Sequence, residues 1–169
     1  MATFNKFNSF VEAVAEKTHN LGSDTIKVVL SNTGPVATNT QLSNITQISN
    51  GNGYTTGGTV ATTSSSAQTS GTYKLVLADV VFTASGGSIG PFQYVVLYND
   101  TATNDELIGW YDYGTALTIT TGNTFTVAII PYTYNHTNIH LVGVGNKVNI
   151  EFDIIGKYVA RMKTVLNPA

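Results

Sequence analysis

The sequence contains little charge and no cysteine. Charged residues make up 11% of its 169 residues, against about 25% in an ordinary globular domain. The absence of cysteine excludes disulfide bonds and thiolate metal sites. The net charge is −2 and no basic block is present, which disfavours nucleic acid as a direct ligand because phosphate binding needs clustered lysine or arginine. A run of about 18 apolar residues is also missing, so no membrane-spanning helix is expected.

The polar surface is predicted to consist of serine, threonine, asparagine and glycine, as in TGGTVATTSSSAQTSGT at 56–72. Hydroxyls and amides form hydrogen bonds but do little acid–base chemistry. Nucleophile-elbow and phosphate-loop motifs are missing too. These features predict a protein without catalytic activity, cofactor or metal, built to pack against neighbouring proteins. The N-terminal segment has no apolar run, so synthesis in a cytoplasm is expected.

An amphipathic helix is predicted at the N-terminus, within residues 1–22. Ser9 and Glu12 have the spacing of a capping box, and Phe10, Val14 and Leu21 fall on one helical face. A glycine follows at position 22 and would end the helix. The helix would cover a sheet of its own chain or dock onto a partner.

Period-two patterns rich in Val, Ile, Thr, Tyr and Phe follow the helix and predict a single β domain over residues 23–130. With 42% hydrophobic residues, the chain can bury one core. The expected fold is mainly β, an antiparallel β-sandwich or jelly-roll-like barrel. Segments 49–58 and 64–71 are predicted to be a turn-rich loop and a flexible hairpin tip. The expected strands are 25–30, 40–48, 59–63, 73–83, 92–98, 106–111, 116–120 and 125–130.

The C-terminal segment, residues 131–169, is predicted to form a hairpin and a short helix packed on the same domain. Residues 147–153 alternate as a strand. Ile155, Tyr158, Val159 and Met162 then recur at helical spacing. This helix would cover the end of its own barrel or pair with copies of itself about a symmetry axis.

Three local clusters carry side chains that could support ligand or metal binding. His136 and His140 have the spacing of two metal ligands on a helix, but the surrounding residues indicate a turn. Residues 99–106 carry several oxygen side chains that suit calcium, yet the EF-hand spacing is missing and an Asx-rich turn is favoured. The third cluster is aromatic. Strand alternation places Trp110 on one face of the strand, where it is expected to fill the core. Tyr111 and Tyr113 lie on the other face.

Several motifs resemble virion structural proteins of tailed bacteriophages over about residues 5–126. The motifs are NSFVEAVAE at 8–16, NLGSDT at 20–25, GTYKLVLAD at 71–79, IGPF at 89–92 and VLYNDTA at 96–102. The resemblance implies a head decoration or cement protein located in the virion. Its partners would be the major capsid protein or other virion proteins, and copies of itself, with a homotrimer favoured.

The end of the chain resembles a different family. FTVAIIPYT at 125–133 and VNIEFDIIGKYV at 148–159 are similar to the end of a riboflavin synthase barrel, over about residues 125–162. In that family this piece supplies closing strands and a helix that helps to form a trimer. Two resemblances in one chain predict a fusion near residues 120–127. The chain has no room for two barrels, so the active site of that enzyme is not carried over.

The sequence therefore predicts a non-catalytic capsid decoration protein that stabilises a phage head by protein–protein contacts. The alternative is a tail or fibre component that binds host glycans through Tyr111 and Tyr113. An enzyme related to riboflavin synthase is a third class. The candidate interface residues are Phe10, Val14, Leu21, Tyr111, Tyr113, Ile155, Tyr158, Val159 and Met162.

Overall fold

The computed structural model describes residues 2–128, which fold into antiparallel β-sheets with very little helix. The mainly β, antiparallel fold class is thereby confirmed. These residues lie in the first of two units into which the chain divides, Met1–Pro131. The elements are β1 (Thr3–Lys6), α1 (Ser9–Ala15), β2 (Ile26–Ser31), the 3-10 helix η1 (Leu42–Asn44), β3 (Thr59–Ala61), β4 (Thr63–Thr69), β5 (Thr72–Leu77), β6 (Val80–Thr83), β7 (Ile89–Asn99), β8 (Leu107–Ile119) and β9 (Thr124–Val127).

The largest sheet has five strands in the order β1-β8-β7-β2-β3. Each neighbouring pair is antiparallel. Hydrophobic residues run almost without interruption through β2 and β7, a pattern typical of strands that are covered on both faces. In β2, Val28 and Leu30 belong to one hydrophobic core and Val29 belongs to another. The sheet therefore separates two cores.

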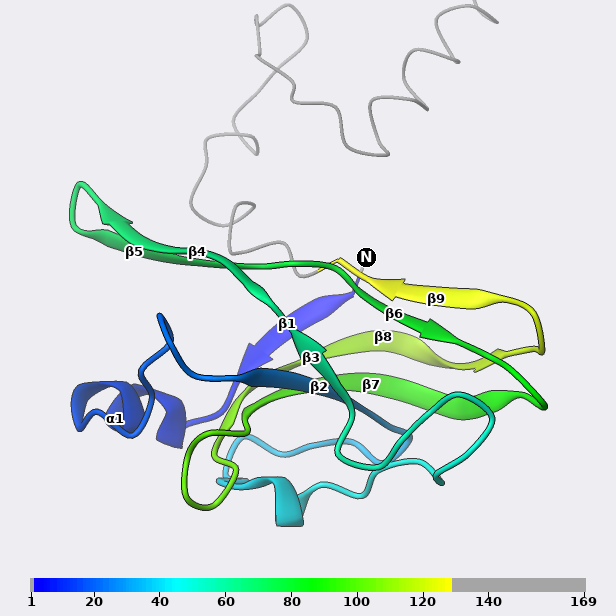
Figure 1. Ribbon diagram of the computed structural model, residues 1–169. Coiled ribbons are helices and arrows are strands. Elements are labelled where there is room, and N and C mark those ends of the chain that lie inside the picture. The colour runs from blue at the N-terminus through cyan, green and yellow to red at the C-terminus, as the bar shows by residue number, and fades with distance from the viewer. Residues whose placement is uncertain (1, 129–169) are drawn as a thin grey trace, which may run out of the picture. The chain divides into compact units, whose positions relative to one another are not determined.

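The larger core lies between the five-stranded sheet and a second layer formed by the antiparallel pair β6–β9 (Figure 1). Phe82 of this second layer and Phe92 of the sheet are both fully buried in it. The smaller core lies on the opposite face, beneath the loop that carries η1, and contains Phe7, Val96 and Trp110. Such layering is compatible with a β-sandwich or barrel.

The N-terminal helix is much shorter than the sequence indicated. Helix α1 ends at Ala15, and the expected continuation to Gly22 is absent. Asn8 occupies the capping position without a side-chain hydrogen bond, so the predicted capping box is also wrong. Lys17 then adopts a left-handed φ of 66°, which breaks the helical path. His19 follows with its ring buried in the protein. Tertiary contacts thus override helix propensity in this segment.

The strand predictions differ from the structure in five places. Residues 40–48 contain η1 rather than a strand, and the two segments predicted at 106–111 and 116–120 belong to one long strand, β8. Strand β1 was missed because four residues carry too little periodicity. Strand β4 was missed because its serine and threonine residues resemble loop composition. The expected strand at 73–83 is divided into β5 and β6.

Several expectations fall outside the described residues. They concern the strand at 147–153, the C-terminal helix, the hairpin of residues 131–169 and the pair His136 and His140. The division into segments 1–22, 23–130 and 131–169 stays a prediction. Among the residues that the structure describes, no helix is long and apolar enough to cross a membrane.

Candidate functional site

A row of aromatic side chains connects β8 to β9 and is called here the aromatic row. The ring of Tyr111 lies 5.0 Å from that of Phe4, centroid to centroid. Tyr113 lies 6.4 Å from Phe125 in an edge-on arrangement, and Phe125 lies 5.0 Å from Phe92. Tyr111 packs against the larger core, and Tyr113 contacts Phe125, which packs against the same core, so both rings lie on that side of the sheet. The row thus combines rings from β1, β7, β8 and β9.

One part of the aromatic row is buried in the larger core, and another part is exposed to solvent. Phe92 is buried, and Phe125 and Tyr111 are partly buried against the larger core. Burial raises the pKa of the Tyr111 phenol above its ordinary value of 10.0, so this group stays protonated near neutral pH. Tyr113 is 49% exposed. A half-exposed ring held by a second ring is suited to stacking against a flat ligand.

The backbone around Tyr113 is set by its neighbour Asp112. The pairing of β1 with β8 ends at this residue, so β8 leaves the β1 edge as it reaches Tyr113. The Asp112 carboxylate accepts hydrogen bonds from Gln93 Nε2 at 2.9 Å and from the Gly114 N–H at 2.8 Å. Gly114 has a φ of +87°, a conformation that glycine adopts readily. These contacts bend the strand and leave Tyr113 accessible.

A second candidate site is a polar cavity of about 600 Å³ at the turn between β7 and β8. Its volume falls within the range of small-molecule sites. Its walls carry hydroxyl, amide and charged groups, and none of the aromatic row lines it. The lining residues are Lys17, Thr18, Asn20, Asp24, Thr101, Ala102, Thr103, Asn104 and Glu106.

Asn99 at the end of β7 organises the chain beside this cavity. The fully buried side chain donates to Asp24 Oδ2 at 2.6 Å and to His19 Nδ1 at 3.0 Å. Its Oδ1 accepts the backbone N–H groups of Thr101 and Ala102 at 3.0 Å and 3.3 Å. These bonds identify residues 99–106 as the Asx-rich turn that the sequence favoured. Within residues 2–128, no group of three or more acidic, histidine or cysteine side chains is placed to hold a metal.

His19 is the one histidine among the described residues, and it is buried beside Asn99. Because Asn99 donates to Nδ1, the proton of the neutral ring lies on Nε2, which has no hydrogen-bond partner in the described part of the chain. Burial lowers the pKa of His19 below 6.5, although the nearby carboxylates of Glu106 and Asp24 oppose the shift. The ring is therefore mostly neutral near pH 7, and its surroundings give it a structural role.

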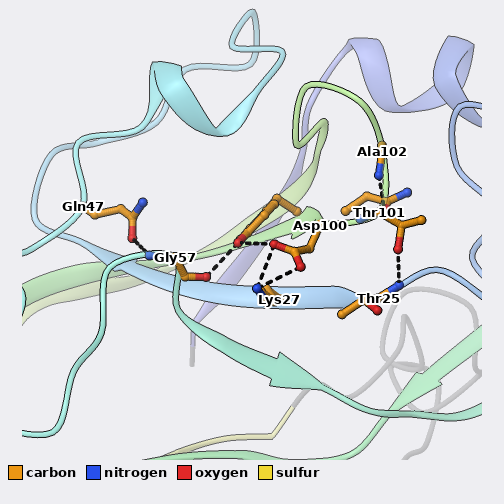
Figure 2. A network of polar contacts seen from close by, with 9 residues as sticks. Thr25, Lys27, Gln47, Gly57, Asp100, Thr101 and Ala102 are labelled. Atoms are coloured by element: carbon orange, nitrogen blue, oxygen red, sulfur yellow. Dashed lines mark hydrogen bonds and ion pairs between the residues drawn. The ribbon is translucent and has the colours of Figure 1, made fainter.

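A further polar network ties the loop after η1 to the sheet (Figure 2). Lys27 Nζ lies 2.8 Å from Asp100 Oδ2, and both side chains are partly exposed. The Tyr98 hydroxyl lies 2.7 Å from the Gly57 carbonyl and 3.1 Å from Asp100 Oδ1. Burial, with a smaller contribution from Asp100, raises the pKa of Tyr98 far above its usual value. Gln47 Oε1 accepts the Gly57 N–H at 2.9 Å. These hydrogen bonds and the ion pair therefore hold the loop after η1 against the sheet.

The sequence-predicted interface residues within the described part of the chain lie in different environments. Leu21 is buried in the larger core and Phe10 packs against it, whereas Val14 is 42% exposed. Tyr111 and Tyr113 are brought together with Phe4 and Phe125, which the sequence reasoning did not select. Their only sequence signal was aromatic character on neighbouring predicted strands. The remaining candidates, Ile155, Tyr158, Val159 and Met162, lie outside the described residues.

Trp110 was expected to fill the core, on the face opposite Tyr111 and Tyr113, and this is confirmed. It is 8% exposed and belongs to the smaller core, where its ring lies 4.5 Å from that of Phe7. Tyr111 packs against the larger core on the other face. The three residues therefore cannot make one aromatic platform, as the alternation indicated.

Comparison with known proteins finds two similarities, both limited to part of the chain. A family described as "Lumazine binding domain" matches residues 112–153. Riboflavin synthase of Photobacterium phosphoreum is 44% identical over 57 residues, which is 32% of this chain and 26% of that protein. The match thus spans about a quarter of the length of the relative. No solved structure matches the chain.

These findings overturn the virion interpretation. They support the lumazine-binding family and a riboflavin synthase relative in place of a tailed-phage structural family over residues 5–126. The predicted capsid decoration or cement function, the glycan-binding tail alternative, the virion location and the expectation of no enzyme are therefore corrected. The physical reason is that low charge and hydroxyl-rich strands describe an average surface, whereas a ligand site needs only a few residues. The capsid protein was expected as a partner only because of the virion function. The homotrimer stays a prediction.

The predicted fusion point is also corrected. The family match begins at residue 112, inside β8, whereas the junction was expected at 120–127. Strand β8 is continuous from Leu107 to Ile119 and pairs with β7 on both sides of Asp112. The matched segment is therefore integrated into the same sheet as the residues before it.

Proposed function

We propose that this protein binds a lumazine- or flavin-type heterocycle and that the aromatic row forms one wall of the site. One observation carries the proposal. The segment that matches the lumazine-binding family begins at Asp112, and the next residue, Tyr113, presents a half-exposed ring against Phe125. Both rings lie inside the matched segment. In this proposal the two β layers form a sandwich or small barrel, with the ligand at the side where β8 faces β9.

The chemistry of the aromatic row fits such a ligand. Lumazines and flavins are flat conjugated rings, and stacking on aromatic side chains is worth about 1–3 kcal/mol per ring in nucleobase recognition. The Tyr113–Phe125 contact fixes the orientation of the exposed ring, so less side-chain entropy is lost on binding. The polar cavity at the β7–β8 turn has no aromatic wall and lies outside the matched segment. The aromatic row is therefore the better candidate.

The proposal is tested by titrating the full-length protein into riboflavin, and separately into a ribityl-substituted lumazine, while ligand fluorescence is followed. We expect saturable binding to at least one of the two. Tyr113→Ala should weaken that binding by about tenfold, because one stacking contact is lost.

Two matched variants make the test specific. Tyr73→Ala removes a tyrosine of equal exposure, 50% against 49%, that lies outside the matched segment. Asn104→Ala alters the wall of the polar cavity. Both should bind as the wild type does. The proposal is wrong if neither ligand binds saturably, or if Tyr73→Ala weakens binding as much as Tyr113→Ala.

Synthesis of riboflavin is the second candidate function, favoured by the 44% identity with riboflavin synthase. To test this function, the protein is incubated with the lumazine alone. Riboflavin should then accumulate with time and in proportion to the amount of protein. Saturable lumazine binding without product would retain the binding function and exclude this second one.

A further inference from the structure

Strands β4 and β5 run out from the rest of the described chain as a two-stranded ribbon (Figure 1). We call residues 65–76 of this ribbon the arm. Its base is held because Leu75 packs against the larger core and Leu77 is buried. Beyond this base, every residue from 67 to 74 is exposed. An irregularity in the pairing at residues 63–65 marks the point where the arm leaves the body.

The arm is a well-formed hairpin, although the sequence indicated a flexible tip. Ser70 and Gly71 have φ values of 50° and 81°. Two successive positive φ values are the signature of the tight turn that matches the twist of paired strands. The Ser66 and Tyr73 hydroxyls lie 2.7 Å apart across the ribbon. An isolated two-stranded hairpin is nevertheless only marginally stable in water, so further strand pairing would stabilise it.

Strand β4 presents a seven-residue edge without the residues that usually block edge pairing. Within residues 2–128, β4 pairs only with β5, so its other side offers unused backbone donors and acceptors. Its residues, TSSSAQT, include no charge or proline, and its one pairing irregularity lies at the base, between Thr63 and Ser65. Strands β1, β3 and β9 have three or four residues each. The β5 edge carries Lys74.

We propose that two copies of this chain pair through their β4 strands, antiparallel and about a twofold axis. A strand without charge can meet its own copy without repulsion, and facing serine and threonine side chains can hydrogen-bond across the axis. The result is a four-stranded sheet in the order β5-β4-β4-β5. Each Lys74 then lies on an outer strand, at least about 14 Å from the other at a strand spacing of about 4.8 Å. Isologous pairing of this kind closes as a dimer.

The test measures the mass of the full-length protein by sedimentation across a wide range of concentration. The wild type should form a dimer. A variant in which residues 67–74 are replaced by Asn-Gly keeps the paired Ser66 and Leu75 beside a two-residue turn. This variant should be monomeric, with roughly half the mass of the wild type. Circular dichroism and thermal melting check that it is folded.

A pair of charge variants tests the edge itself. Thr69 and Thr72 are direct cross-strand partners in the hairpin. Thr69→Lys adds a charge on β4 and should weaken dimer formation by at least tenfold, whereas Thr72→Lys adds the same charge on β5 and should leave it unchanged. When all seven residues of β4 pair with their copies, Thr69 faces Thr63 of the other copy, so mixing Thr69→Lys with Thr63→Glu should restore dimers. A monomeric or trimeric wild type, an unchanged mass in the shortened variant, or equal effects of the two lysine variants would each overturn the proposal.

Discussion

The side-chain amide of Asn99 donates a 2.6 Å hydrogen bond to the Asp24 carboxylate, which joins two residues 75 positions apart in the sequence. Asp24 Oδ2 also accepts the backbone N–H of Asn20 at 2.7 Å. The contact therefore connects the segment after α1 to the end of β7. Because the Asn99 side chain is fully buried and uses both of its polar atoms, it is a sensitive position for stability.

Asn99→Ala should lower the free energy of unfolding by about 3 kcal/mol, because several buried partners lose a hydrogen bond at once. Chemical denaturation with a linear extrapolation measures this. Asn104→Ala, on the exposed part of the same turn, should change the value by less than about 1 kcal/mol. Equal effects of the two substitutions would show that the hydrogen bonds of Asn99 contribute no more to the free energy of unfolding than those of Asn104.

The buried His19 predicts a pH dependence. Its folded-state pKa is lowered below 6.5, so the unfolded chain binds this proton more readily than the folded one. The contribution of His19 to the free energy of unfolding is thus complete above pH 6.5 and declines as the pH falls from 6.5 toward the lower pKa of the folded state. Denaturation curves between about pH 7.5 and pH 5 should show this decline. His19→Gln should flatten it, and an unchanged slope in that variant would refute the assignment.

Tyr98→Phe should destabilise the protein more than Lys27→Met does. The Tyr98 hydroxyl donates a hydrogen bond to the Gly57 carbonyl, and Tyr98 is 1% exposed. Its loss should cost about 1–2 kcal/mol. The Lys27–Asp100 pair is partly exposed, so its loss should cost less than about 1 kcal/mol and depend on salt. Thermal melting at low and high ionic strength distinguishes the two, and a larger effect of Lys27→Met would contradict the interpretation.

Two glycines with similar backbone angles should differ in their tolerance of alanine. Gly58 has a φ of +74°, and a Cβ there would lie 2.0 Å from the Val28 carbonyl oxygen. Gly122 has a φ of +84° with nothing within 4 Å. Gly58→Ala should therefore lower stability by more than about 3 kcal/mol, whereas Gly122→Ala should cost only about 1 kcal/mol of backbone strain. Similar melting temperatures for the two variants would indicate that the backbone near Val28 can move.

The mainly β architecture could be predicted because its signals are local. The β-branched and apolar residues of β2, including Val28, Val29 and Leu30, predict a strand at 25–30 without reference to any distant residue. Alternation likewise placed Trp110 opposite Tyr111. Strand β4 could not be recognised in this way, because serine and threonine side chains on an exposed ribbon show no hydrophobic period. The two-residue Ser70 and Gly71 turn was the signal that could have revealed it.

The aromatic row was visible in the sequence only in part. The sequence indicated Tyr111 and Tyr113 as neighbouring aromatic residues. Phe4 joins them because β1 pairs with β8, and Phe125 joins them because the β6–β9 layer packs across the larger core. Helix α1 shows the same limit in the opposite direction. Its helical pattern continued to Leu21, yet the burial of His19 and Leu21 stopped the helix at Ala15.

The antiparallel β character and the core position of Trp110 follow from the sequence alone, since each depends on neighbours along one strand. The register that joins Asn99 to Asp24, the early end of α1 and the contact of Tyr113 with Phe125 were set by the three-dimensional packing. Such contacts depend on which strands become neighbours in space, and the free energy that selects them is shared among residues far apart in the chain.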